Sequence, residues 1–249
     1  MTVLKISSIK SKPFKFKEFI IHQEKTAMKV GTDAVLLGAW ATVDFYPDTI
    51  LDIGSGTGII SLMLAQRSNA STIDAVEIEE KAYEQTVENF EQSDWADRLF
   101  CYHSSFDNFA KEMIEEEETY DLIVSNPPFY TDDYQTGNKP RNTARFTTSL
   151  SFKNLLFGVS KLLSKNGVFS VIIPKKEQEH FVALAKKEQL FLHRFCDIKG
   201  TQTSEVKRSL LSFSFSQKEI VREELIIEIT RHQYTKEYID LTKDFYLKM

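Results

Sequence analysis

The chain has 249 residues, of which 42% are hydrophobic and 27% are charged, and its formal net charge is −5. This length and apolar content predict one domain, residues 1–249, with a sizeable buried core. No apolar stretch approaches membrane-spanning length, and the first residues lack the apolar run of a signal peptide. Cys101 and Cys196 lie in apolar runs without metal-ligand spacing, which favours reduced core cysteines in a cytoplasmic protein that binds no metal.

Residues 1–30 form a basic appendage, whose seven lysines and two glutamates carry +5 and leave −10 on the rest of the chain. The segment Pro13-Phe14-Lys15-Phe16-Lys17 alternates rings with lysines. This alternation suits RNA, with rings that stack on bases and with Lys12, Lys15 and Lys17 at phosphates. The alternative is a strand whose rings are buried and whose lysines are solvated. Nucleic-acid binders need a basic surface. The net negative charge of the chain therefore argues against an RNA substrate, and the positive charge of the appendage answers that objection.

Helical and strand patterns alternate through most of the chain. Helices are expected near residues 33–41, 57–67, 79–91, 106–117, 150–163 and 176–188. Strands are expected at residues 50–53, 72–76, 99–103, 121–124, 168–173, 190–197 and 209–216, with 225–229 as a weaker candidate. This alternation predicts an α/β fold with helices on both faces of a parallel sheet. No helix separates the last two long strands, so one of them is expected to pair antiparallel at that edge.

A glycine-rich turn, Gly54-Ser55-Gly56-Thr57-Gly58, follows the first of these strands, and Thr57 is a candidate N-cap for the next helix. The G-x-G-x-G spacing differs from the dinucleotide fingerprint and lacks the lysine of a P-loop. Asp52 precedes the turn and favours a cationic ligand over a pyrophosphate. Glu77 ends the next strand, where α/β nucleotide sites hold ribose hydroxyls. An adenosine with positive charge and no phosphate fits both carboxylates, which indicates S-adenosylmethionine.

Asn126-Pro127-Pro128-Phe129 follows the strand at residues 121–124. Because proline has no N–H, the two prolines force the chain out of the sheet in a stiff, extended turn. The Asn126 side-chain oxygen and the Pro127 carbonyl can each accept a hydrogen from an amino group, and Phe129 can stack on a base. Alone, the same tetrapeptide also fits an ordinary loop.

These motifs resemble those of the class I S-adenosylmethionine-dependent methyltransferases. Residues 52–58 look like their cofactor loop, Val76-Glu77 like their ribose position, and 126–129 like the motif of enzymes that methylate planar nitrogens. Residues 27–40 resemble the signature of bacterial tRNA(Val) (adenine-N6)-methyltransferases, which modify adenine 37, and 234–238 and 241–247 resemble that family's C-terminal segment. The resemblance implies a Rossmann-like, doubly wound, seven-stranded sheet, mostly parallel with one antiparallel edge strand.

The resemblance also implies roles for particular residues. Cofactor contacts are expected from Asp52, Gly54, Ser55, Gly56, Gly58, Glu77 and Phe106, with Lys29 and Thr32 closing the pocket from the N-terminal side. Asp33 is expected mainly to cap its helix. Related enzymes hold the adenine amino group with an acidic residue where Ser105 stands here, so Asp107 either replaces it or caps the following helix. Catalysis is assigned to Asn126, Pro127 and Phe129.

The remaining expectations concern the substrate. The long polar loop at residues 130–148 is expected to grip RNA, with Lys139, Arg141 and Arg145 joining Lys12, Lys15 and Lys17. We therefore expect a monomeric tRNA adenine-N6 methyltransferase. Three alternatives stay open at this point: a protein glutamine-N5 methyltransferase, an rRNA guanine-N2 methyltransferase, and a catalytically silent binding subunit with the same fold.

Overall fold

The computed structural model describes residues 12–127 and 150–249. Phe129, Lys139, Arg141 and Arg145 lie outside the described residues, as does the loop at residues 130–148. The roles expected of these residues in base stacking and RNA binding therefore stay predictions.

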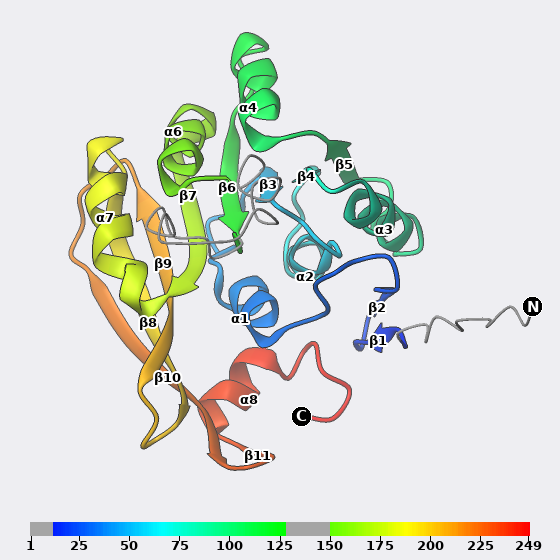
Figure 1. Cartoon of the computed structure of the whole chain (residues 1–249), viewed down its shortest axis with the longest axis vertical. Helices are drawn as coiled ribbons and strands as arrows, with labels where there is room; N and C mark the ends of the chain where they lie inside the picture. The colour runs from blue at the N-terminus through cyan, green and yellow to red at the C-terminus, as the bar shows by residue number, and fades with distance from the viewer. Residues whose placement is uncertain (1–11, 128–149) are drawn as a thin grey trace, which may run out of the picture.

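Five neighbouring strands form a parallel core at one side of the sheet, as the alternating pattern predicted (Figure 1). In spatial order they are β7 (Leu163–Pro174), β6 (Tyr120–Ser125), β3 (Thr49–Ile53), β4 (Thr72–Glu77) and β5 (Leu99–His103). The intervening helices are α2 (Ile59–Arg67), α3 (Glu80–Glu91), α4 (Phe106–Glu115) and α6 (Phe152–Leu162). Parallel strands require such crossover connections. The predicted α/β class is confirmed.

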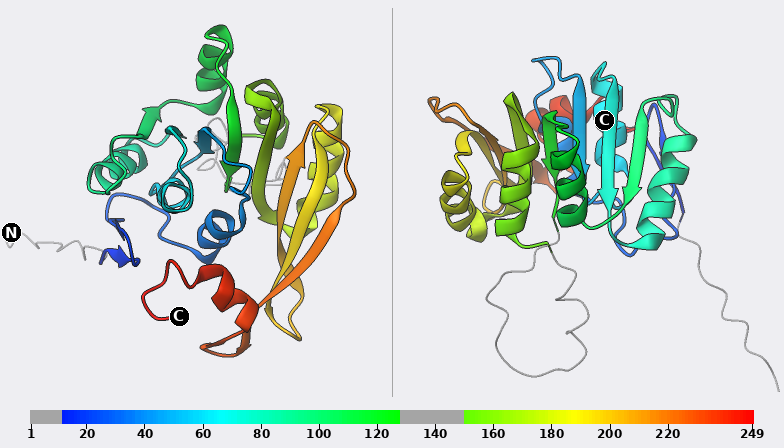
Figure 2. Two further views of the ribbon diagram at one scale, coloured as in Figure 1. Left: turned by 180° about the vertical axis from the view of Figure 1, so that it is seen from behind. Right: turned by 90° about the horizontal axis from the view of Figure 1, so that it is seen from above.

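Helices cover both faces of this sheet (Figures 1 and 2). Successive side chains of a strand point to opposite faces. Ile50 accordingly joins one buried cluster with residues of α1 (Thr32–Trp40) and α2, whereas Leu51 joins another with residues of α4 and α6. Because these five strands are parallel, their carboxyl ends lie together at one edge of the sheet.

The antiparallel member of the last two long predicted strands is interior, which corrects the sequence prediction. A short second antiparallel strand ends the sheet on the same side. β9 (Val206–Ser214) lies between β7 and β8 (Phe191–Thr201) and is antiparallel to both. The short connection from β8 permits only this direction. β10 (Val221–Thr230) then pairs parallel with β8, and β11 (Gln233–Tyr234) pairs with β10, so the sheet has nine described strands rather than seven. η1 (Lys175–Glu177) and α7 (Gln178–Lys187) connect β7 to β8.

The first described residues pack against the C-terminal segment (Figure 2). The N-terminal hairpin, β1 (Phe14–Lys15) and β2 (Ile20–Ile21), meets the segment after α8 (Lys236–Thr242), where the Lys17 N–H donates to the Phe245 carbonyl at 2.9 Å. Phe16 and Phe19 are only 3% and 5% exposed. The expectation that the rings of Pro13–Lys17 stack on RNA is therefore wrong for Phe16, whose ring is buried as in the alternative interpretation.

Among residues 12–127 and 150–249, no helix combines the length and the apolar character that crossing a membrane requires.

Candidate active site

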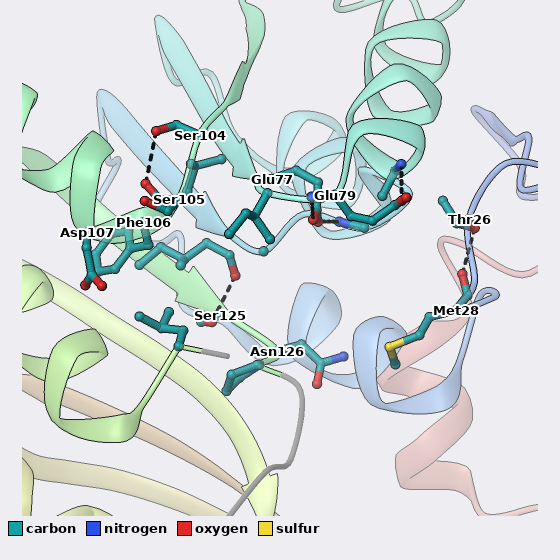
Figure 3. A pocket seen from close by; sticks show the side chains of 18 of the residues that line it. Thr26, Met28, Glu77, Glu79, Ser104, Ser105, Phe106, Asp107, Ser125 and Asn126 are labelled. Carbon is teal, nitrogen blue, oxygen red and sulfur yellow. Dashed lines mark hydrogen bonds between the residues drawn. The ribbon is translucent and has the colours of Figure 1, made fainter. Parts of the chain in front are cut away.

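A cavity of about 440 Å³ lies beyond the carboxyl ends of β3, β4 and β6 (Figure 3). We call it the strand-end cavity. Among the residues singled out from the sequence, it is lined by Gly54, Gly56, Glu77, Phe106, Asn126 and Pro127. Its other lining residues are Thr26, Ala27, Met28, Ile53, Val76, Ile78, Glu79, Ala82, Ser104, Ser105, Asp107, Asn108, Ser125 and Leu150. The fold thus brings motifs that are far apart in the sequence to one place.

The glycine turn leaves room beside its backbone. Gly54 and Gly56 have φ values of +77° and +61°, a region that side chains disfavour, and an added Cβ at either position meets no atom within 4 Å. Gly58 differs, because a Cβ there would lie 2.7 Å from the Phe90 ring. Gly58 is the left-handed N-cap of α2, so Thr57 does not have the predicted capping role. The first two glycines border the cavity, and the third serves helix packing.

Glu77 organises the turn from the end of β4. Its side chain is 8% exposed, and its two oxygens accept hydrogen bonds from the Gly56 N–H at 2.8 Å and the Glu79 N–H at 2.9 Å. A carboxylate oxygen has a second lone pair, so both oxygens can also accept from a ligand. The predicted ribose-binding position therefore has a further role, because it holds the glycine turn in place.

Asp52 lies behind the turn rather than in the cavity lining. It is fully buried, and one of its oxygens accepts from the Ser61 hydroxyl at 2.7 Å, while the other has no partner among the described residues. Burial raises the pKa of Asp52 to about 7 despite that hydrogen bond. Ser55 is also turned away, 3.2 Å from the Thr86 hydroxyl. The expected direct contacts of Asp52 and Ser55 are replaced by roles behind the turn.

The N-terminus of α4 forms another wall. Ser105 is its N-cap and accepts from the Asn108 N–H at 3.3 Å, so the capping role considered for Asp107 belongs to Ser105. Asp107 is exposed and lines the cavity, and one of its oxygens accepts from the Asn154 amide at 3.1 Å. Asp107 can therefore present a carboxylate to a ligand. The Phe106 ring lies at the same wall.

Residues 26–28 cover the cavity from the N-terminal side (Figure 3). The Thr26 hydroxyl donates to the Met28 carbonyl at 2.8 Å, and the Lys29 ammonium donates to the carbonyls of Gln23 and Thr26. Lys29 is absent from the described lining, so it holds this segment in shape instead of making the expected direct contact. Thr32 lines a different cavity, described below.

Helix α1 also departs from its predicted cap. Gly31 is the N-cap and makes no side-chain capping hydrogen bond. The Asp33 carboxylate instead accepts from the Arg208 guanidinium at 2.7 Å, which links α1 to β9. The tertiary partner outcompetes the local one because a charge-assisted hydrogen bond is stronger than a neutral capping bond.

Asn126 stands at the exit of β6. The Ser125 hydroxyl donates to the Ile53 carbonyl at 2.9 Å and so ties the ends of β6 and β3 together. The Asn126 side chain is half-buried and makes no hydrogen bond to any other described residue. Figure 3 shows its amide at the cavity, across from Met28. The amide is therefore available to a ligand.

The cavity is acidic. Glu77, Glu79 and Asp107 line it, and no lysine or arginine does so within residues 12–127 and 150–249. Such a wall favours a cation and opposes a phosphate. The same part of the chain holds no cluster of three His, Cys, Asp or Glu side chains that suits a metal ion.

Several lining residues escaped the sequence analysis. Ile78 and Glu79 directly follow Glu77, so their position after a strand was the available signal. Residues 26–28 carried no such signal in the sequence, apart from Ala27 and Met28 opening the segment 27–40 that resembles the family signature. Only the folded chain brings them to the glycine turn.

Comparison with known proteins gives the family. The sequence model of one protein family, the methyltransferase small domain, matches residues 30–187. A tRNA1(Val) (adenine(37)-N6)-methyltransferase from Christiangramia forsetii is 56% identical over 96% of this chain and 99% of its own.

Solved structures show the same fold. A predicted O-methyltransferase from Agrobacterium tumefaciens has a TM-score of 0.65 at 19% identity and covers 86% of this chain and 96% of its own. A methyltransferase complexed with SAH has a TM-score of 0.56 at 14% identity, with coverages of 78% and 53%. The chain therefore belongs to the family of tRNA1(Val) (adenine(37)-N6)-methyltransferases.

Proposed function

We propose that this chain transfers a methyl group from S-adenosylmethionine to the N6 amino group of adenine 37 in a valine tRNA. The observation that carries the proposal is the meeting of Asn126 and Pro127 with the glycine turn and Glu77 at one acidic cavity. The chain's near full-length similarity to enzymes with this name supports the same activity.

The cavity suits the cofactor in size and charge. Its volume of about 440 Å³ is in the range of small-molecule sites. S-adenosylmethionine supplies a methyl group bound to a sulfonium cation. The open backbone at Gly54 and Gly56 admits close approach, and Glu77 has lone pairs left for ribose hydroxyls. We assign the adenine to the wall made by Ile78, Phe106 and Asp107.

Asn126 and Pro127 address the weak nucleophilicity of an aromatic amino group, whose lone pair is delocalised into the ring. Two acceptors, the Asn126 side-chain oxygen and the Pro127 carbonyl, would each bind one amino hydrogen. These bonds favour a pyramidal nitrogen with an exposed lone pair and stabilise the charge that develops on it. No strong general base is needed, because the methylated nitrogen becomes acidic and loses its proton afterward. Phe129 is proposed to stack on the base.

For the polyanionic substrate we propose contacts on the basic side of the molecule. Lys12 and Lys15 are exposed on the N-terminal hairpin. The Lys17 ammonium donates to the Lys243 carbonyl at 2.6 Å, so Lys17 also anchors the C-terminal segment. Lys139, Arg141 and Arg145 complete the proposed set. Base 37 lies in a loop, so presenting it costs less than flipping a base out of a duplex.

The test is methyl transfer from labelled S-adenosylmethionine to unmodified total tRNA, followed by nucleoside analysis. We expect N6-methyladenosine, and we expect none in a valine tRNA transcript whose adenine 37 is replaced by guanine. Cofactor binding without transfer to tRNA would contradict the proposal and favour rRNA guanine or protein glutamine. Absence of cofactor binding would favour the catalytically silent subunit.

A further inference from the structure

A second cavity, of about 720 Å³, lies between the two ends of the chain. We call it the chain-end groove. Its walls come from β1, the start of α1, β10, β11, α8 and the last residues, which Figure 1 shows gathered around the C-terminus. It is lined by Phe14, Lys15, Val30, Gly31, Thr32, Gly200, Ile227, Glu228, Tyr234, Tyr238, Tyr246, Leu247, Lys248 and Met249. The activity proposed above leaves this family-like C-terminal segment without a role.

Four aromatic residues, Phe14, Tyr234, Tyr238 and Tyr246, line the groove. Phe14 and Tyr246 lie edge to face with centroids 6.1 Å apart, and Tyr234 lies 5.3 Å from Tyr238. Phe14, Tyr234 and Tyr246 are only half-buried, so part of each ring remains at the groove. Partly exposed rings of this kind are the surfaces on which single-stranded nucleic acids stack their bases.

The charge of the groove is opposite to that of the strand-end cavity. Lys15 and Lys248 line it and are exposed, and neither ammonium has an ion-pair partner within the described residues. Glu228 is the acidic member of the lining, and its carboxylate already accepts the His232 N–H at 3.1 Å. The two lysines are therefore available to phosphate groups.

The groove and the strand-end cavity are lined by neighbouring residues of one segment, residues 26–32. Residues 26–28 line the strand-end cavity and residues 30–32 line the groove, so one short segment forms a wall of both. Three extended residues span at most about 10 Å, so Met28 and Gly31 are no farther apart than that. A stacked strand rises about 3.4 Å per nucleotide, so about three stacked nucleotides or fewer extended ones span this distance. A strand with one base in the cavity can thus reach the groove.

We infer that the chain-end groove binds the nucleotides that flank the target adenine, with bases against Tyr234 and Tyr246 and phosphates at Lys15 and Lys248. The inference rests on the proposed function and names the surface that holds its substrate. Rings interleaved with unpaired lysines favour RNA over a protein partner, because each nucleotide supplies one stacking face and one negative charge.

The first experiment compares Lys15→Ala/Lys248→Ala with Lys186→Ala/Lys187→Ala, which removes two exposed lysines from the last turn of α7. Binding of the valine tRNA is measured by fluorescence anisotropy over a range of salt. Loss of two single-strand phosphate contacts should lower the slope of log K against log salt by about 1.4. We expect about tenfold weaker binding for the groove variant alone, with unchanged S-adenosylmethionine affinity.

The second experiment separates the contribution of the Tyr234 ring, through stacking, from that of the Tyr234 hydroxyl. Tyr234→Leu removes the ring, whereas Tyr234→Phe keeps it. Base stacking on an aromatic side chain contributes a factor of about 5 to 100 in affinity. We expect tRNA affinity to fall by that factor in the leucine variant and to stay within about twofold of wild type in the phenylalanine variant, with equal melting temperatures as the fold check.

The outcomes separate the two proposals. Wild-type affinity and salt slope in the groove variants, in a protein that methylates tRNA, would overturn the groove and leave the proposed function standing. A wild type that binds tRNA through the groove but methylates no adenine would overturn the function alone. A protein that binds the cofactor but no tRNA would overturn both.

Discussion

The strand-end cavity and the chain-end groove meet at residues 26–32 but are built in opposite ways. The cavity is formed largely by residues 53–127, at the ends of adjacent parallel strands, and the charged residues in its described lining are all acidic. The groove is formed by residues 14–32 and 200–249, and its lining includes four aromatic residues, two lysines and one glutamate. The central part of the chain thus supplies most of the cavity proposed for the cofactor, whereas segments near the start and the end of the described chain build the surface proposed for RNA.

The contrast in charge has a physical consequence. A carboxylate wall stabilises a cationic cofactor and repels phosphates, so an RNA backbone is favoured outside the cavity. The groove, whose lining at Gly31 is about 10 Å or less from Met28 of the cavity, supplies positive charge through Lys15 and Lys248. The two sites can then bind ligands of opposite charge without competition, and only a neutral base needs to enter the acidic cavity.

The largest expected effect separates chemistry from binding. Asn126→Ala removes one proposed acceptor of the amino group, and we expect the methylation rate at saturating substrates to fall about 10²- to 10³-fold. Affinities for S-adenosylmethionine and tRNA should stay within about twofold of wild type. Single-turnover kinetics and equilibrium binding provide the measurement.

Asn69→Ala is the matched control, because Asn69 is exposed and lines neither site. Weakened cofactor binding in the Asn126 variant, with an undiminished rate, would assign Asn126 to the cofactor instead of the base.

A second prediction concerns the core behind the cavity. Asp52 has an ordinary pKa of 3.8, which burial raises to about 7 in the folded chain. The native state therefore binds a proton that the unfolded state has lost between about pH 4 and 7. The stability that this proton contributes is complete below pH 4 and is lost as pH rises through 7. Its size is on the order of 3 to 4 kcal/mol.

Asp52→Asn removes this titration while keeping an acceptor for Ser61. Relative to wild type, the free energy of unfolding of the variant should rise by a few kcal/mol from pH 4 to pH 8. Urea denaturation at several pH values measures the difference. A constant difference between the two proteins over this range would show that Asp52 does not titrate there.

The smallest effect tests the segment that the two sites share. Lys29→Met removes the ammonium that holds the carbonyls of Gln23 and Thr26. Loss of about 1 kcal/mol of hydrogen bonding should weaken S-adenosylmethionine and tRNA binding by similar factors, each about 3- to 10-fold.

Lys25→Met is the control in the same segment, because the Lys25 ammonium pairs with Glu84 and Glu88 on α3. If the Lys29 variant weakens only one of the two ligands, the cavity and the groove are independent and the shared wall does not couple them.

The parallel strands, their helices and the glycine turn could be predicted because their signals are local: hydrophobic periodicity and residues that lack a Cβ or an N–H. Roles for which a local contact competes with a distant partner could not be predicted. Asp33 binds Arg208 instead of capping α1, and Phe16 packs in the core instead of lying free. Arg208 is far from Asp33 in the chain, and Phe16 packs against the distant Tyr246 as well as against the nearby Phe19.

The sequence by itself determined the α/β class, the methyltransferase character and the residues at the strand ends, because a strand, its turn and the next helix are written in consecutive residues. The tertiary structure alone decided that β9 is interior, that Asp52 and Ser55 stand behind the turn, and that residues 14–32 and 234–249 enclose a groove. These features depend on which distant surfaces bury each other, and burial is a property of the packed chain rather than of any segment.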